Sequence, residues 1–258
     1  MAKKGMVKTE EEISIIREGG RRLAVVLRAV KDKVVPGVTT RELDMFAEKL
    51  IRAGGDLPAF LNYTPEGAGR PYPGTLCVSV NDEAVHGIGG DRVLLEGDIV
   101  GIDLGVIHEG LFSDAALTVA VGQTDGEAKK LMRVTEEALA VGIAQARVGK
   151  TTGDIGHAIE KYVKDNGFVV VEELGGHGVG YAQHEDPHIS NYGTRGQGTR
   201  LKKGMVLALE PIVNEGTRYV RVLSDGYTYA TKDHKRSAHF EHTIVVTDGA
   251  PEILTVPS

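Results

Sequence analysis

The chain has few of the features that mark secreted or membrane-bound proteins. Its only cysteine, Cys77, cannot form an internal disulfide, which favours a reducing compartment. No uninterrupted apolar run approaches the ~18 residues of a membrane-spanning helix, and the basic start of the chain meets acidic residues before any apolar stretch. We therefore expect a cytoplasmic protein with neither a signal peptide nor a membrane span.

The chain also has fewer basic than acidic residues. The 258 residues include 30 Lys and Arg against 36 Asp and Glu, a formal net charge of -6, so we expect no direct recognition of nucleic acid. Hydrophobic residues at 41% and charged residues at 26% are ordinary for a globular protein and exclude intrinsic disorder and a fibrous repeat. Because no linker-like segment interrupts the chain, we expect a single domain over residues 1–258.

The first third of the chain changes from a helical to a strand-like pattern. Apolar residues at helical spacing predict a helix over 13–30, which ends before Pro36 and Gly37. Thr39 or Thr40 can cap a second helix, whose pattern runs to Gly54. Short runs rich in β-branched residues follow between residues 56 and 122 and predict strands.

The same order then starts again in the second half of the chain. The segment 37–42 resembles 149–154, the segment around Asp103 resembles the one around Glu210, and Asp114 aligns in the same way with Glu241. This period is too long for a solenoid. It indicates two related α+β halves, about 10–125 and 126–258, that share one core.

Two acids stand in apolar, strand-like sequence, where an acid is unfavourable. A hairpin turn centred on His108 and Glu109 would place Asp103 directly opposite Asp114, with Cβ atoms ~4.5–5.5 Å apart. Like charges there are destabilising, so either one carboxyl keeps its proton or a cation binds both. The alternative is a small shift in register that turns one aspartate to solvent.

The second half carries two acids in equivalent places. Glu210 follows one strand-like run and Glu241 precedes another. Four converging carboxylates would repel one another, whereas two divalent ions would balance their charge. His177, in a glycine-rich loop, is a candidate neutral ligand, although such a histidine is often only exposed. Carboxylates with one imidazole suit Mn, Fe, Co or Zn, and two such ions ~3.5–4 Å apart suit metal-assisted hydrolysis.

Two further histidines need separate treatment. His184 and His188 match the string H-E-x-x-H, but that zinc motif works only on a helix. Pro187 favours extended backbone, which would separate the two histidines by ~13 Å along a strand, so we reject a zinc site of this kind. His184 and His86 are either functional or ordinary hydrogen-bonded surface histidines.

Four segments together resemble the methionine aminopeptidases of the pita-bread fold. In chain order they are GIDLGVIHEGLFSDAALT, GGHGVGYAQHEDP, LALEPIVNEG and SAHFEHTIVVTDG, and the resemblance runs from about residue 8 to the end. The short interval between His184 and Glu210 resembles the bacterial first type. The resemblance implies an α+β fold with two pseudo-symmetric halves around a curved, mostly antiparallel sheet. It also implies removal of the initiator methionine when the second residue is small.

The resemblance further implies roles for individual residues. Two divalent ions (Co, Mn, Fe or Zn) would be held by Asp103, Asp114, His177, Glu210 and Glu241. Glu210 would also shuttle a proton, His184 would hydrogen-bond the scissile carbonyl, and His86 would contact a substrate backbone nitrogen. The methionine pocket would be formed, together with His86 and His184, by Phe60, Tyr63, Tyr72, Cys77, Gln183 and Tyr227.

This chain departs from the family pattern in the pocket. The family typically has a small residue or cysteine near Phe60, an aromatic residue at Gln183 and a tryptophan at Tyr227, and residues 64–70 look like a short insertion. A flexible thioether can still fill an altered pocket. The partners implied are nascent N-terminal peptides and, through them, the ribosome, and the expected state is a monomer.

Two other functions remain open from the sequence. An Xaa-Pro aminopeptidase or creatinase-like hydrolase shares the fold, but such relatives usually carry an additional N-terminal domain, and this chain begins at the catalytic half. A non-catalytic binding module would have lost ligands, whereas all five ligand positions are present here.

Overall fold

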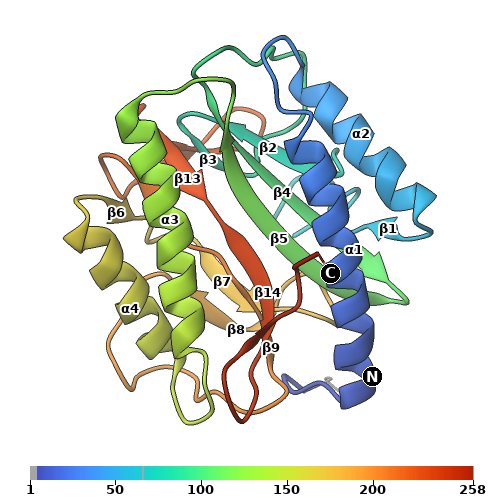
Figure 1. Ribbon diagram of the computed structural model, residues 1–258, viewed down its shortest axis with the longest axis vertical. Helices are drawn as coiled ribbons and strands as arrows, with labels where there is room; N and C mark the ends of the chain where they lie inside the picture. The colour runs from blue at the N-terminus through green and yellow to red at the C-terminus, as the bar shows by residue number, and fades with distance from the viewer. Residues whose placement is uncertain (1–4, 66, 258) are drawn as a thin grey trace.

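The computed structural model describes residues 5–65 and 67–257 (Figure 1). The start of the chain and one residue of the expected insertion therefore lie outside the described residues. Within these ranges, no helix has both the length and the apolar character needed to cross a membrane.

The four helices begin where the sequence provides caps. They are α1 (Glu10–Lys31), α2 (Thr40–Ala53), α3 (Gly126–Gln145) and α4 (Thr152–Asp165). Thr9, Thr39 and Thr151 each accept a hydrogen bond from the third helical N–H, while an acid there bonds back to the cap. The first two helices are confirmed, with Thr39 as the cap of the second. Helices α2 and α4 each have 14 residues.

The central sheet has nine strands in the order β1-β4-β5-β14-β9-β7-β8, with β2 beside β4 and β15 beside β14. Their bounds are β1 Leu57–Pro58, β2 Leu76–Val80, β4 Ile99–His108, β5 Leu111–Ala120, β7 Gly175–Gly178, β8 Glu185–Ser190, β9 Val206–Leu209, β14 Glu241–Val245 and β15 Glu252–Ile253. Every strand pair between described residues is antiparallel. Strand β14, from late in the chain, thus lies in the middle of the sheet, between β5 and β9.

Two small sheets lie beside the central one. They have the orders β13-β10-β6 and β11-β12-β3. Their bounds are β3 Glu83–Val85, β6 Val169–Val170, β10 Ile212–Asn214, β11 Val220–Val222, β12 Tyr229–Thr231 and β13 Ser237–His239.

The helices cover one face of the central sheet (Figure 1). On β4, Ile102 and Leu104 pack with α1 and α2, and on β9, Leu207 and Leu209 pack with α3 and α4. Because side chains alternate along a strand, the residues between these apolar ones face the other side of the sheet. Asp103 is one of them, so its carboxyl points away from the helices.

The hairpin of β4 and β5 corrects one expectation. His108 pairs with Leu111, so the turn consists of Glu109 and Gly110, with φ angles of 48° and 81°. A two-residue turn with positive φ at both positions matches the twist of the strands, and glycine favours it. Centring the turn one residue earlier was wrong. Asp103 pairs with Ala116, and Asp114 is its diagonal neighbour on the same face.

Candidate metal centre

The structure brings the five predicted ligands together on the face away from the helices. Asp103 and Asp114 lie on β4 and β5, His177 on β7, Glu210 directly after β9, and Glu241 at the start of β14. Asp114, His177 and Glu241 offer ligand atoms that all lie within 4.8 Å of one another. Glu210 is 3.6 Å from His177, between Oε1 and Nε2, and Asp103 lines the same cavity.

The buried carboxyl oxygens lack partners. Asp103 Oδ1, Asp114 Oδ1 and Glu241 Oε1 are buried and have no hydrogen-bond partner among the described residues. Ionised carboxylates only accept hydrogen bonds, so buried oxygens without donors need cations or protons. The residues at this site therefore fit divalent metal ions.

Burial is also the main reason why these acids hold protons when no ion is bound. It raises the pKa of Asp103 to about 7, and burial together with the neighbouring carboxyls raises the pKa values of Asp114 and Glu241 well above their ordinary values. Glu210 differs, because burial raises its pKa but the nearby imidazoles of His239 and His177 outweigh burial and lower it.

Stability of the metal-free protein should therefore fall as the pH rises from about 6.5 to 8. In this window the folded state keeps carboxyl protons that the unfolded chain has lost, so it binds more protons and loses stability with rising pH. Below it, histidines whose pKa is lowered to about 4 oppose the trend. Urea unfolding of metal-free wild type and Glu241→Gln measures the effect.

Between about pH 6.5 and 8, the free energy of unfolding of the wild type should fall by more than 1 kcal/mol relative to that of Glu241→Gln. One unit of pKa shift corresponds to about 1.4 kcal/mol. Saturating Mn²⁺ should abolish the fall in the wild type, because bound ions replace the protons. Parallel profiles in the metal-free proteins would contradict the interpretation.

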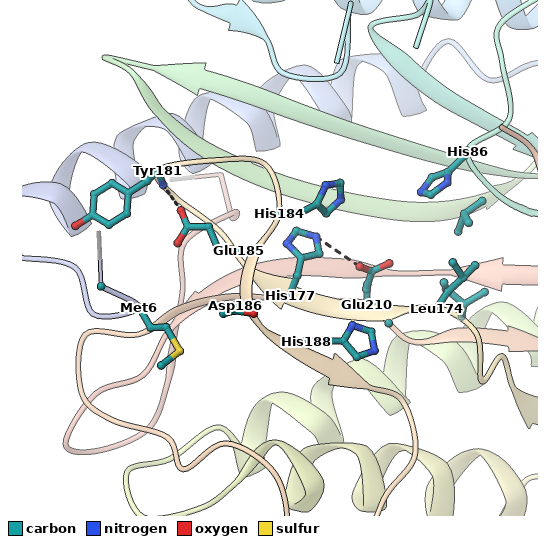
Figure 2. Close-up of a pocket in the computed structure, with 14 residues that line it drawn as sticks. Met6, His86, Leu174, His177, Tyr181, His184, Glu185, Asp186, His188 and Glu210 are labelled. Atoms are coloured by element: carbon teal, nitrogen blue, oxygen red, sulfur yellow. Dashed lines mark hydrogen bonds and ion pairs between the residues drawn. The ribbon is translucent and has the colours of Figure 1, made fainter. Parts of the chain in front are cut away.

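His184 is held with a defined nitrogen toward the cavity. Its Nδ1 lies 2.9 Å from the hydroxyl of Tyr63, and its ring centroid lies 4.4 Å from that of His177. Figure 2 shows His86, His177, His184 and Glu210 around one cavity. Loss of water around the ring lowers the pKa of His184 to about 4, so the ring is neutral near pH 7.

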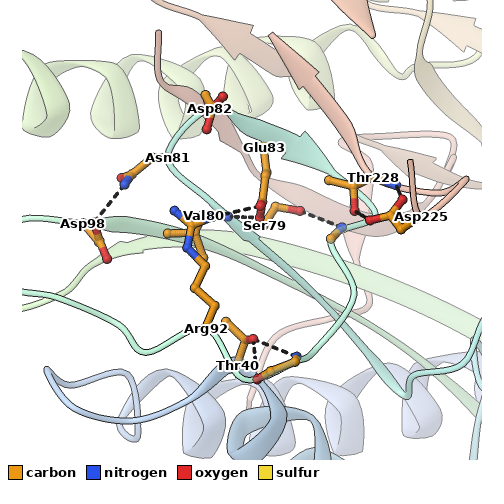
Figure 3. Close-up of polar contacts among 12 residues, drawn as sticks. Thr40, Ser79, Val80, Asn81, Asp82, Glu83, Arg92, Asp98, Asp225 and Thr228 are labelled. Atoms are coloured by element: carbon orange, nitrogen blue, oxygen red, sulfur yellow. Dashed lines mark hydrogen bonds and ion pairs between the residues drawn. The ribbon is translucent and has the colours of Figure 1, made fainter. Parts of the chain in front are cut away.

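His86 occupies a strained backbone position, with φ at 60°. The N–H of the next residue, Gly87, donates to Ser79 Oγ at 3.0 Å, and Tyr72 donates to the Gly87 carbonyl at 2.8 Å. Thr228 approaches the His86 carbonyl at 3.4 Å and is itself bound to Asp225 (Figure 3). These contacts hold the His86 ring at the cavity, and burial lowers its pKa to about 4.

The cavity that contains the carboxyls also has an apolar lining. Besides His86 and His184, five of the expected pocket residues line it: Phe60, Tyr63, Tyr72, Cys77 and Tyr227. The rings of Tyr72 and Tyr227 meet edge to face at 5.2 Å, and the Tyr227 hydroxyl donates to the Arg70 carbonyl. The segment 64–70 contributes Pro65 to the lining. Gln183 does not line this cavity, but it is buried and donates its amide to Asp114.

One residue of the centre was not predicted from the sequence. His239, on β13, is buried, and its Nε2 lies 3.5 Å from Glu210 Oε2 and 3.8 Å from Glu241 Oε2. Its position two residues before Glu241 in a strand-like run was the available signal, because such residues face the same side.

The loop with His184 is fixed by a residue from the start of the chain. The Lys8 side chain is fully buried, and its ammonium lies 2.6 Å from Glu185 Oε2. Glu185 also accepts hydrogen bonds from the backbone N–H groups of Tyr181 and Ala182 (Figure 2). The turn before His184 is therefore tied to the N-terminal segment.

Lys8→Met should lower the free energy of unfolding by about 3 kcal/mol, because removal of the ammonium leaves the Glu185 carboxylate largely buried without a countercharge. Lys203→Met is the matched control. Lys203 pairs with Asp248 at the same 2.6 Å, but both side chains are more than half exposed, so its loss should leave the free energy of unfolding nearly unchanged. Equal losses in urea unfolding would contradict this prediction.

Comparisons with known proteins agree with this geometry. Residues 14–248 match Metallopeptidase family M24. Methionine aminopeptidase 1 of Bacillus subtilis is 47% identical, over 96% of this chain and 98% of its own length. The crystal structure of methionine aminopeptidase from Thermotoga maritima has a TM-score of 0.93 at 44% identity, covering 97% of this chain and 98% of that one. The enzyme from Rickettsia prowazekii also reaches 0.93, at 38% identity, with 97% and 99% covered.

Proposed function

The chain belongs to metallopeptidase family M24 and has methionine aminopeptidase activity by close homology over its full length, and we propose that it acts at a centre of two divalent ions. The α+β pita-bread fold and the activity expected from the sequence are confirmed. An Xaa-Pro aminopeptidase and a non-catalytic module are set aside by the same homology. The substrates are the N-termini of nascent proteins.

One observation carries the proposal for the metal centre. Three buried carboxyl oxygens without donors surround the position where Asp114, His177 and Glu241 approach within 4.8 Å. Asp114 and Glu241 would be shared by both ions, Asp103 would bind one of them, and His177 and Glu210 would bind the other. Bound there, Co, Mn, Fe or Zn would polarise the scissile carbonyl and lower the pKa of a bound water.

The chain's own residues would then position the substrate and move the proton. When the Tyr63 hydroxyl donates to Nδ1 of neutral His184, the ring carries its proton on Nε2 and can donate it to the carbonyl oxygen. Glu210, whose lowered pKa keeps it ionised, would accept the proton of the attacking water and pass it to the leaving amine. His86 would contact the substrate backbone nitrogen.

The apolar part of the cavity that contains the carboxyls would hold the methionine side chain. Its aromatic and thiol lining offers apolar contacts to a thioether. We place Gln183 behind this lining, next to Phe60, rather than in contact with the thioether.

We further propose that the protein is a monomeric cytoplasmic enzyme that meets its substrates near the ribosome. Action on nascent chains supports this location, and the buried free thiol of Cys77 suits a reducing compartment. We also propose that residues 1–258 form one catalytic domain of two related halves, about 10–125 and 126–258. The equal lengths of α2 and α4 support these halves.

The test is methionine release by metal-stripped protein, before and after addition of Mn, Co, Fe or Zn. We expect release only with metal, and only from peptides that begin Met-Gly or Met-Ala rather than Met-Leu. Xaa-Pro peptides are the control and should remain intact. Release without metal, or equal cleavage of Xaa-Pro peptides, would overturn the proposed centre or its specificity.

A further inference from the structure

Gln183 makes a contact that links the loop before His184 to the carboxyl cluster. Its side chain is only 1% exposed. Its Nε2 donates a hydrogen bond to Asp114 Oδ2, although the two residues are 69 positions apart. This orientation suits the ionised, metal-binding form of Asp114, because an ionised carboxylate only accepts hydrogen bonds and so needs the NH₂ end of the amide.

The Oε1 end of the Gln183 amide occupies space that is free because residue 105 is glycine. Gly105 lies opposite Asp114 in the hairpin, and a Cβ there would come within 3.0 Å of Gln183 Oε1 and 2.8 Å of the Phe60 ring. Gln183 Oε1 is buried without a hydrogen-bond partner among the described residues. The contact with Asp114 is therefore the hydrogen bond that fixes this side chain.

We propose that Gln183 is a positioning residue that orients the Asp114 carboxylate for metal binding. The Thr243 hydroxyl accepts a hydrogen bond from the Asp114 N–H at 2.9 Å and donates one to the Asp114 carbonyl at 2.7 Å, so it fixes the backbone of Asp114. Gln183 fixes the side chain as well. Each carboxylate oxygen has two acceptor sites, so the amide on Oδ2 leaves one site there and both sites on Oδ1 for ions.

A neutral amide suits this task better than a cation. Its N–H stabilises the ionised carboxylate, which is the form that binds metal, without adding positive charge beside the ions. Hydrogen bonds to ligands from outside the coordination sphere typically contribute 10–100-fold in metal affinity. This inference rests on the proposed metal centre.

The experiment compares the Mn²⁺ affinity of metal-free wild type and Gln183→Met by isothermal titration calorimetry. Methionine has nearly the same length and no donor, so affinity should fall by about 10–100-fold. The unfolding midpoint of the metal-free variant reports whether it is folded. If Gln183→Met does not fold, Gln183→Asn, which keeps the amide but cannot reach as far, takes its place with the same expectation. Gln197→Met, on an exposed loop, is the control and should bind as the wild type does.

The outcomes separate this inference from the proposed function. If the wild type binds Mn²⁺ and releases methionine while the folded Gln183 variant binds equally well, the role of Gln183 is overturned and the centre stands. Tighter binding by the variant also overturns it, because the amide would then compete with an ion. A wild type that binds no divalent ion overturns both.

Discussion

Asp114→Ala is expected to abolish methionine release and metal binding together. Asp114 is one of the two ligands that would contact both ions, and its buried Oδ1 has no other partner among the described residues. Metal ions contribute several kcal/mol of transition-state stabilisation, and each 1.4 kcal/mol is a factor of ten, so turnover should fall about 10³-fold or more. Metal content after dialysis and the rate of methionine release measure the two losses.

A matched variant distinguishes a lost ligand from a damaged fold. Asp56 is also a buried acid, but its carboxylate binds His108 at 2.7 Å, away from the metal centre. Asp56→Ala should cost about 1–3 kcal/mol of stability and keep the ions, because it leaves a buried hydrogen-bonding group unpaired. Metal-free Asp114→Ala should lose a similar amount of stability, because it leaves the buried Gln183 amide without its acceptor, so the two variants should differ in metal content rather than in folding. Full turnover in Asp114→Ala would contradict the assignment.

His184→Ala should lower kcat about 10²–10³-fold and leave the metal content unchanged. The expected loss is that of one hydrogen bond to the oxygen where charge develops in the transition state. Because Nδ1 is hydrogen-bonded to the Tyr63 hydroxyl, Nε2 is the nitrogen that donates to the substrate. The substitution should therefore change kcat more than KM. Turnover at saturating metal, with metal content of the same sample, is the measurement.

His188→Ala is the control, because His188 lies on β8, the strand that begins directly after His184. It should turn over like the wild type. Loss of metal in His184→Ala would make His184 a ligand instead, and equal losses in both variants would point to the strand rather than to the ring.

What could be predicted from the sequence was local. The helices follow from apolar spacing and from threonine caps such as Thr39, whose partners lie within four residues. The acids of the centre stand out because they interrupt apolar strands. The rejection of a helical zinc motif is confirmed too, since β8 begins at Glu185 and continues through His188 in extended form.

What could not be predicted depends on turn geometry or on distant partners. The hairpin register depends on a positive φ at Glu109, a residue that usually avoids it. Lys8 and Glu185 are 177 positions apart, and no periodicity links them. The contact of Gln183 with Asp114 likewise requires the fold, because it joins a loop to a strand of the other half.

The place of β14 in the sheet has a consequence for the order in which the enzyme becomes active during synthesis. This strand pairs with β5 and β9 and carries Glu241, yet it is made after every other strand of the central sheet except β15. While it is inside the ribosomal exit tunnel, the two halves lack the strand between them and the centre lacks a ligand. A growing copy of this enzyme should therefore have no activity until β14 has emerged.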